Sequence, residues 1–126
     1  MFKIRMGVPE MRDLWDSLEA KSKAGTLSKV EAELFKKWHK ALQFLSQNPR
    51  HRGLASHEID SLSRRYGDKV WQSYLENRTP AAGRMFWVYG PGKAEITIVG
   101  LEPHPEDKKS VGYAKVRLSA TGAEEE

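Results

Sequence analysis

The sequence predicts an α+β domain in which two helices are followed by most of an antiparallel sheet. Apolar residues alternate at the N-terminus, then recur at helical spacing, and after Pro49 fall into short extended runs separated by turn residues. Helices grouped in one part of the chain and strands in another are typical of the α+β class. The 126 residues fit one domain. We expect a single domain over residues 1–119 and a flexible acidic tail over 120–126.

The chain is expected to begin with a strand and continue with a helix. Over residues 2–8, large apolar residues alternate with lysine, arginine and glycine, which is typical of a strand with one buried face. Pro9 suits the first turn of a helix, where its missing N–H would have no intrahelical partner. Apolar residues follow at helical spacing, and Gly25 is a typical residue at a helix end. We expect this first helix from about Pro9 to Ala24.

A capping box marks the start of a second helix. In Ser28-Lys29-Val30-Glu31, the hydroxyl and the carboxylate can satisfy backbone N–H groups that have no intrahelical partner. Asn48-Pro49 ends this helix. Its expected apolar stripe consists of Val30, Leu34, Trp38, Ala41, Leu42 and Leu45. A short turn joins the two helices, so they should form an antiparallel hairpin lying against the sheet.

Three to four strands are expected after the hairpin. Lys69–Leu75, Arg84–Tyr89 and Ala94–Leu101 are rich in the β-branched and aromatic residues that strands favour. Gly90-Pro91-Gly92 is a turn signal, so the last two of these strands should form a hairpin. Tyr113–Leu118 gives a last short edge strand.

Composition narrows the kinds of chemistry that the chain can perform. It has no cysteine, which excludes disulfides, thiolate metal sites and cysteine nucleophiles. The spacing of its four histidines does not suit zinc, and we expect neither a metal nor a cofactor. No apolar run approaches the ~20 residues that cross a bilayer, so a cytoplasmic location without a membrane partner is expected. The net charge of +4 favours an anionic partner.

Five short strings, taken in order, carry a resemblance to a known family. They are Asn48-Pro49-Arg50-His51, Gly53-Leu54-Ala55-Ser56-His57, Val70-Trp71-Gln72-Ser73-Tyr74-Leu75, Gly83-Arg84-Met85-Phe86-Trp87-Val88-Tyr89 and Ile96-Thr97-Ile98-Val99-Gly100-Leu101, with His104 after them. With the preceding strand and helical hairpin, they resemble the RelE/ParE superfamily of toxins from bacterial type II toxin-antitoxin systems over nearly the whole chain. The resemblance implies a concave basic sheet face flanked by the hairpin, and a cognate antitoxin protein that wraps the toxin.

The resemblance leaves the activity open between two kinds of toxin, because fold alone does not fix function. RelE-like members are mRNA interferases, endoribonucleases that cut mRNA on the ribosome without a metal, and this is the function that we expect. ParE-like members instead act against DNA gyrase. A third possibility is an inactive relative that only binds its partner.

Four residues are candidates for the catalytic roles of an mRNA interferase: Arg84, His104, Lys69 and Tyr113. Such cleavage needs a base, a cation and an acid. Arg84 corresponds to the family arginine that contacts the scissile phosphate, and His104 can exchange protons at neutral pH. Tyr113 resembles the tyrosine that stacks on or hydrogen-bonds the nucleotide, while Lys69 would serve as a cation or, if desolvated, as a base. Which residue is the base and which is the acid stays open.

Each candidate also has a purely structural interpretation. Arg84 would then be paired with an acidic residue on a neighbouring strand, and His104 would be held in a rigid turn by the prolines on either side of it. Tyr113 would be a half-buried edge residue, and Lys69 a solvated surface charge.

Basic residues in the loops beside the inferred sheet are expected to bind RNA. Lysine and arginine contact phosphates without reading sequence, and their contribution falls as salt rises. Alternatively, these basic residues only keep the surface soluble. Binding of RNA would be favoured only if several of them lay together on one face. The candidates are Arg50, His51, Arg52, Arg64, Arg65, Lys108 and Lys109.

Overall fold

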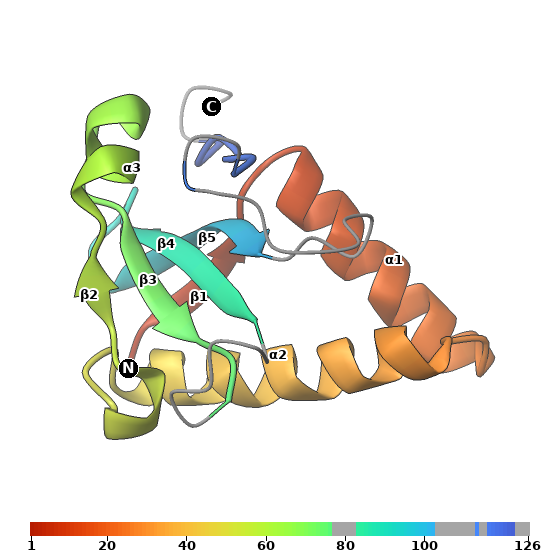
Figure 1. Ribbon diagram of the computed structural model, residues 1–126. Helices are drawn as coiled ribbons and strands as arrows, with labels where there is room; N and C mark the ends of the chain where they lie inside the picture. Colours follow the sequence, from red (N-terminus) through yellow and green to blue (C-terminus); the bar gives the residue numbers. More distant parts are fainter. Residues whose placement is uncertain (77–82, 103–112, 114–115, 123–126) are drawn as a thin grey trace.

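The computed structural model describes residues 1–76, 83–102, 113 and 116–122 of the chain (Figure 1). It confirms the predicted α+β class and the order of a strand, two helices and then a sheet. The elements are β1 (Lys3–Met6), α1 (Glu10–Ala24), α2 (Lys29–Gln47), the 3₁₀ turn η1 (Arg52–Leu54), β2 (His57–Glu58), α3 (Asp60–Tyr66), β3 (Trp71–Tyr74), β4 (Arg84–Tyr89) and β5 (Glu95–Glu102). None of the described helices is long and apolar enough to span a membrane.

The two long helices begin and end at the residues that the sequence indicates. Gly25 ends α1 in the left-handed conformation, with φ of 71°. The capping box of α2 is complete, since the Ser28 hydroxyl accepts from the Glu31 N–H at 3.1 Å and the Glu31 carboxylate accepts from the Ser28 N–H at 3.0 Å. Lys21 of α1 also pairs with Glu31 at 2.7 Å, and this hydrogen-bonded cation lowers the pKa of Glu31. The capping box and this ion pair therefore stabilise the turn between α1 and α2.

The sheet has five strands in the order β1-β5-β4-β3-β2, which differs in two ways from the sequence-based expectation. First, β1 joins the sheet and runs parallel to β5, with Lys3 opposite Glu95 and Met6 opposite Ile98. Second, β2 and α3 occupy a stretch for which no element was expected. The other neighbouring strands are antiparallel, and β4 and β5 form the expected hairpin.

The predicted edge strand over Tyr113–Leu118 is not present among its described residues. Residues 116–119 are instead irregular backbone, and Ser119 donates its N–H to the carbonyl of Val99 in β5 at 2.7 Å. Ala120 then forms an isolated antiparallel bridge with Val8. A side chain at Gly7 would bring its Cβ within 2.8 Å of Ser119 Cβ, so glycine allows β1 and the C-terminal segment to approach closely.

Apolar side chains cover both faces of the sheet. The face toward α1 and α2 carries the larger core, which includes the fully buried Trp38 and Trp87. The opposite face packs Phe86 against Leu62 of α3 and Val116 of the C-terminal segment. This two-sided burial explains the continuous apolar run of β4, because alternate residues of a strand point to opposite faces. We call the face that carries Phe86 the α3 face.

Candidate functional site

Four polar side chains meet at one end of the α3 face: Arg84, Gln72, Glu102 and Tyr113. We call them the Arg84 cluster. Arg84 begins β4 and lies directly opposite Glu102 at the end of β5. Gln72 of β3 lies opposite Phe86, two residues beyond Arg84, so its side chain projects from the same face. The strand register therefore brings these polar residues together from three adjacent strands.

The guanidinium of Arg84 is the centre of this cluster. Its Nε donates to Glu102 Oε2 at 2.9 Å, and its Nη2 donates to the same oxygen. Its Nη1 donates to Gln72 Oε1 and to the Tyr113 hydroxyl, each at 3.3 Å. The Tyr113 hydroxyl donates in turn to Gln72 Oε1 at 2.9 Å. Each nitrogen of the guanidinium thus has a partner, which fixes its plane.

Burial is uneven across the cluster. Glu102 and Gln72 are each 1% exposed, whereas the Arg84 side chain is 20% exposed. A buried carboxylate needs a charged partner, and Arg84 supplies it. Glu102 is therefore the acidic partner on a neighbouring strand that a structural role of Arg84 requires. Of the two charged side chains, Arg84 is the one that solvent reaches.

This arrangement can orient an anion more readily than it can move a proton. A guanidinium stays charged at all physiological pH values, and its planar fork suits phosphoryl oxygens. The Tyr113 phenol beside it adds a hydrogen-bonding group and an aromatic ring, with the guanidinium carbon 5.5 Å from the ring centroid. Because Glu102 already accepts two of the N–H groups, an incoming phosphate would share Arg84 with that carboxylate.

The four predicted catalytic residues are only partly brought together. Arg84 and Tyr113 are in contact. Lys69 is exposed and lies in the turn before β3, where its backbone N–H donates to Asp68. Tyr74, not Lys69, is opposite Arg84, which places Lys69 five residues away along the strand, about 16 Å. Lys69 is thus outside the cluster, and His104 lies outside the described residues.

The predicted RNA-binding residues fall into separate groups. On α3, Arg64 is exposed, and Arg65 donates to the carbonyl of Val116, which ties α3 to the C-terminal segment. Arg50 precedes η1 and Arg52 begins it, and both are exposed. Lys108 and Lys109 lie outside the described residues.

The fifth described candidate, His51, is held within the fold. Its ring stacks on Phe44 with centroids 4.2 Å apart, and its Nδ1 accepts from the Gly53 N–H at 3.0 Å. These contacts fix the chain as it leaves α2 and enters η1. They give His51 a structural role in addition to any contact with RNA.

Two members of the cluster, Gln72 and Glu102, were not singled out from the sequence. A signal for them was present, since Gln72 lies within a predicted strand and Glu102 directly follows another. A polar side chain buried in a strand requires a hydrogen-bonding partner. That requirement predicts a partner but does not identify it.

No protein-family model, curated protein or solved structure matches this chain. Within the described part of the chain, no three histidine, aspartate or glutamate side chains are grouped so as to hold a metal ion.

Proposed function

We propose that this protein is the toxin of a toxin-antitoxin pair, an endoribonuclease that cleaves mRNA on the ribosome with the Arg84 cluster at the scissile phosphate. The observation that carries the proposal is the contact between Arg84 and Tyr113 on the α3 face, where a partly exposed cation adjoins an aromatic hydroxyl. The order of the elements and the parallel β1–β5 pair are consistent with a RelE-like topology.

In the proposed reaction, the ribose 2′-hydroxyl loses its proton and attacks the adjacent phosphate, and the 5′-oxygen leaves with a proton. Arg84 stabilises the negative charge that develops on the phosphoryl oxygens. Tyr113 positions the nucleotide by stacking or by donating its hydroxyl. Gln72 and Glu102 hold Arg84 in place and act through it. His104 is our candidate for proton exchange, because an imidazole titrates near neutral pH.

Cleavage on the ribosome tests this function directly. Purified protein is added to ribosomes carrying a defined mRNA, and the new 5′ ends are mapped. We expect cuts within codons positioned on the ribosome, and at least about 100-fold slower cleavage by Tyr113→Ala, which removes both ring and hydroxyl, and by His104→Ala. Lys23→Ala, an exposed change at the far end of α1, is the control and should cleave normally. Undiminished cleavage by both folded site variants would refute the assignment.

The ion pair between Arg84 and the buried Glu102 favours a second candidate, a ParE-like inhibitor of DNA gyrase. Such a toxin acts through binding surfaces, and a neutralised arginine would serve there as part of the scaffold. In that case the protein should block supercoiling by purified gyrase and leave transcripts intact. An inactive relative would affect neither assay nor cell growth.

The proposed partner is a cognate antitoxin. Expression of the protein alone should arrest bacterial growth, and co-expression of a short acidic reading frame from beside its own gene should restore growth. A protein that arrests growth equally with and without such a frame would contradict the pairing.

A further inference from the structure

Tyr74 ends β3 and lies directly opposite Arg84, the first residue of β4. The next pair along the ladder is hydrogen-bonded, since the Leu75 N–H donates to the Gly83 carbonyl at 3.0 Å. Hydrogen-bonded and non-hydrogen-bonded pairs alternate in an antiparallel ladder, so Tyr74 and Arg84 form a non-hydrogen-bonded pair. In such a pair the Cα atoms are about 4.5 Å apart and both side chains project from the same face. Tyr74 therefore shares the α3 face with the Arg84 cluster.

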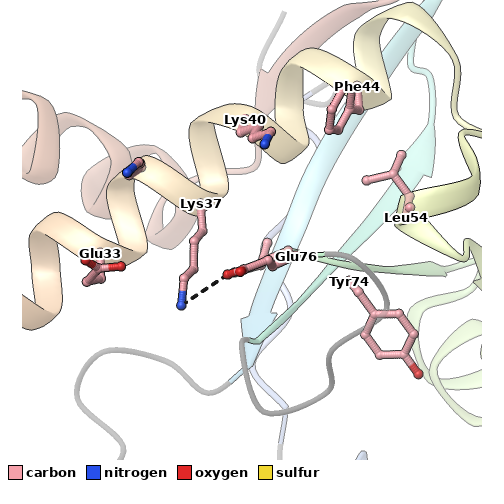
Figure 2. A pocket seen from close by; sticks show the side chains of 10 residues that line it. Glu33, Lys37, Lys40, Phe44, Leu54, Tyr74 and Glu76 are labelled. Atoms are coloured by element: carbon pink, nitrogen blue, oxygen red, sulfur yellow. Dashed lines mark ion pairs between the residues drawn. The ribbon is translucent and has the colours of Figure 1, made fainter.

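The direction of the Tyr74 side chain agrees with this register. Tyr74 borders the cleft between α2, η1 and the end of β3, but Figure 2 shows its ring pointing away from α2 and from the lysines of that helix. Glu76, two residues further along the chain, instead pairs with Lys37 of α2 at 3.3 Å. The nearest carboxylate along the chain is therefore neutralised by a lysine and directed toward α2.

The fold uses the side chain of Tyr74 less than those of the other three tyrosines. The hydroxyls of Tyr66 and Tyr113 donate hydrogen bonds at 2.7 and 2.9 Å, and the ring of Tyr89 packs edge-on against Trp87 with centroids 5.0 Å apart. Tyr74 is half-buried, and among the described residues it makes neither a side-chain hydrogen bond nor an aromatic pair. Its ring and hydroxyl are thus available to a ligand.

Two tyrosines lie on either side of the Arg84 guanidinium along the strands. Tyr113 is level with Gln72, to which its hydroxyl donates. Tyr74 follows Gln72 by two residues on the same face, which places it about 6.6 Å further toward the end of the strand. Arg84 starts opposite Tyr74, and its Nη1 reaches back to Gln72. A phosphate at the guanidinium would therefore have Tyr113 on one side and Tyr74 on the other.

The phosphate of an RNA chain joins two nucleosides, and correct alignment for attack requires both to be held. Aromatic rings bind the bases of single-stranded nucleic acid by stacking, whatever the base. We infer that Tyr74 stacks on the base of one of the two nucleosides joined by the phosphate at Arg84, while Tyr113 binds the other nucleoside. This inference rests on the proposed function, because it takes the RNA phosphate to lie at Arg84. The ligand of the site is thus a dinucleotide step of single-stranded RNA.

Binding of the uridine dinucleotide UpU, followed by NMR titration, tests the inference. The probe carries 2′-O-methyl groups, so it cannot be cleaved, and the spectra also show that each variant is folded. Tyr74→Leu should weaken binding at least about fivefold, because a stacked base contributes at least that factor to affinity. The salt dependence of binding should stay unchanged, because no charge is removed. Tyr74→Phe keeps the ring and should bind within about twofold of the wild type.

Two further probes, each lacking one of the two bases, show which contact is lost. On the probe without the base that Tyr74 holds, Tyr74→Leu should have no effect. On the other probe the substitution should keep its full effect. Equal losses on all three probes would show that the leucine acts through the fold, and would overturn the inference.

The matched control is Tyr89→Leu, the same change at the other end of β4. Tyr89 contacts Trp87 of the larger core, so it belongs to the face of the sheet toward α1 and α2. This control should change the affinity for UpU less than about twofold. An equal loss in the control, a Tyr74→Leu variant that binds UpU as tightly as the wild type, or no binding of UpU by the wild type would each overturn the inference.

The two proposals can fail independently. Normal mRNA cleavage on the ribosome, together with a Tyr74→Leu variant that binds UpU as tightly as the wild type, would overturn the stacking site and leave the nuclease. Base-dependent loss of UpU binding in Tyr74→Leu, without any mRNA cleavage by the wild type, would support the stacking site and overturn the nuclease.

Discussion

Replacement of Arg84 by methionine should destabilise the protein severely, because it removes the cation that pairs with the buried Glu102. Glu102 is 1% exposed and accepts two N–H groups from Arg84. Removing one member of a buried ion pair leaves an uncompensated charge and costs about 3–5 kcal/mol. Small domains are stable by only about 5–15 kcal/mol, so the variant should lie close to unfolding.

A double-mutant cycle separates the cost of leaving the Glu102 carboxylate unpaired from the coupling energy between Arg84 and Glu102. Glu102→Gln removes the charge, and the variant that combines it with Arg84→Met no longer contains a buried carboxylate. We expect this double variant to be about 2 kcal/mol or more stable than Arg84→Met alone. The coupling energy of the pair is this difference plus the cost of Glu102→Gln alone. Urea denaturation at pH 7 gives the four free energies of unfolding. Additive costs, or a cost below about 1 kcal/mol for Arg84→Met, would refute the reasoning.

The cycle also decides how activity data on Arg84 are to be interpreted. If the protein is a toxin, as proposed, loss of toxicity in Arg84→Met alone does not distinguish unfolding from a missing functional group. Loss in the folded double variant, with toxicity retained by Glu102→Gln, would reflect the missing guanidinium.

Three further predictions concern stability and can be measured by urea denaturation. Ser28→Ala should cost about 1 kcal/mol, since it removes the hydroxyl of the capping box, and no change would mean that the cap is redundant. Gly7→Ala should cost about 1–3 kcal/mol because its Cβ would meet Ser119, and a neutral effect would show that this contact relaxes freely. Lys21 lowers the pKa of Glu31 below its ordinary 4.5, so the advantage of wild type over Glu31→Gln should be full near neutral pH. It should shrink as the pH falls through the lowered pKa, and an advantage that grew on acidification would contradict the sign.

Local signals predicted most of the helices and strands. The capping box placed the start of α2, and the apolar run of Arg84–Tyr89 gave the bounds of β4. The seven residues of α3 escaped notice because they span only two turns, with Leu62 and Tyr66 as their large apolar residues. The alternation at the N-terminus predicted a strand but could not specify its neighbour, since a period of two has no information about pairing.

The candidate site was predicted less completely than the fold. Arg84 could be named because a family-like string contains it, and Tyr113 because it resembles the family tyrosine near the expected last strand. Gln72 and Glu102 could not, because their role depends on the register of three strands that are distant in the sequence. Lys69 precedes β3 and lies away from the residue opposite Arg84, and the sequence could not show this because a residue at the mouth of a strand can lie at either end of the sheet.

The pairing of β1 with β5 has a consequence for synthesis of the chain. β1 is made before β5, and it can pair only after residues 95–98 have been made. Contacts between residues that are distant in the sequence slow folding, whereas the helical hairpin forms from residues that are close in the sequence. A chain truncated before Glu95 would lack the strand that joins β1 to the rest of the sheet and the carboxylate that anchors Arg84. Incomplete copies of the protein should therefore be inert.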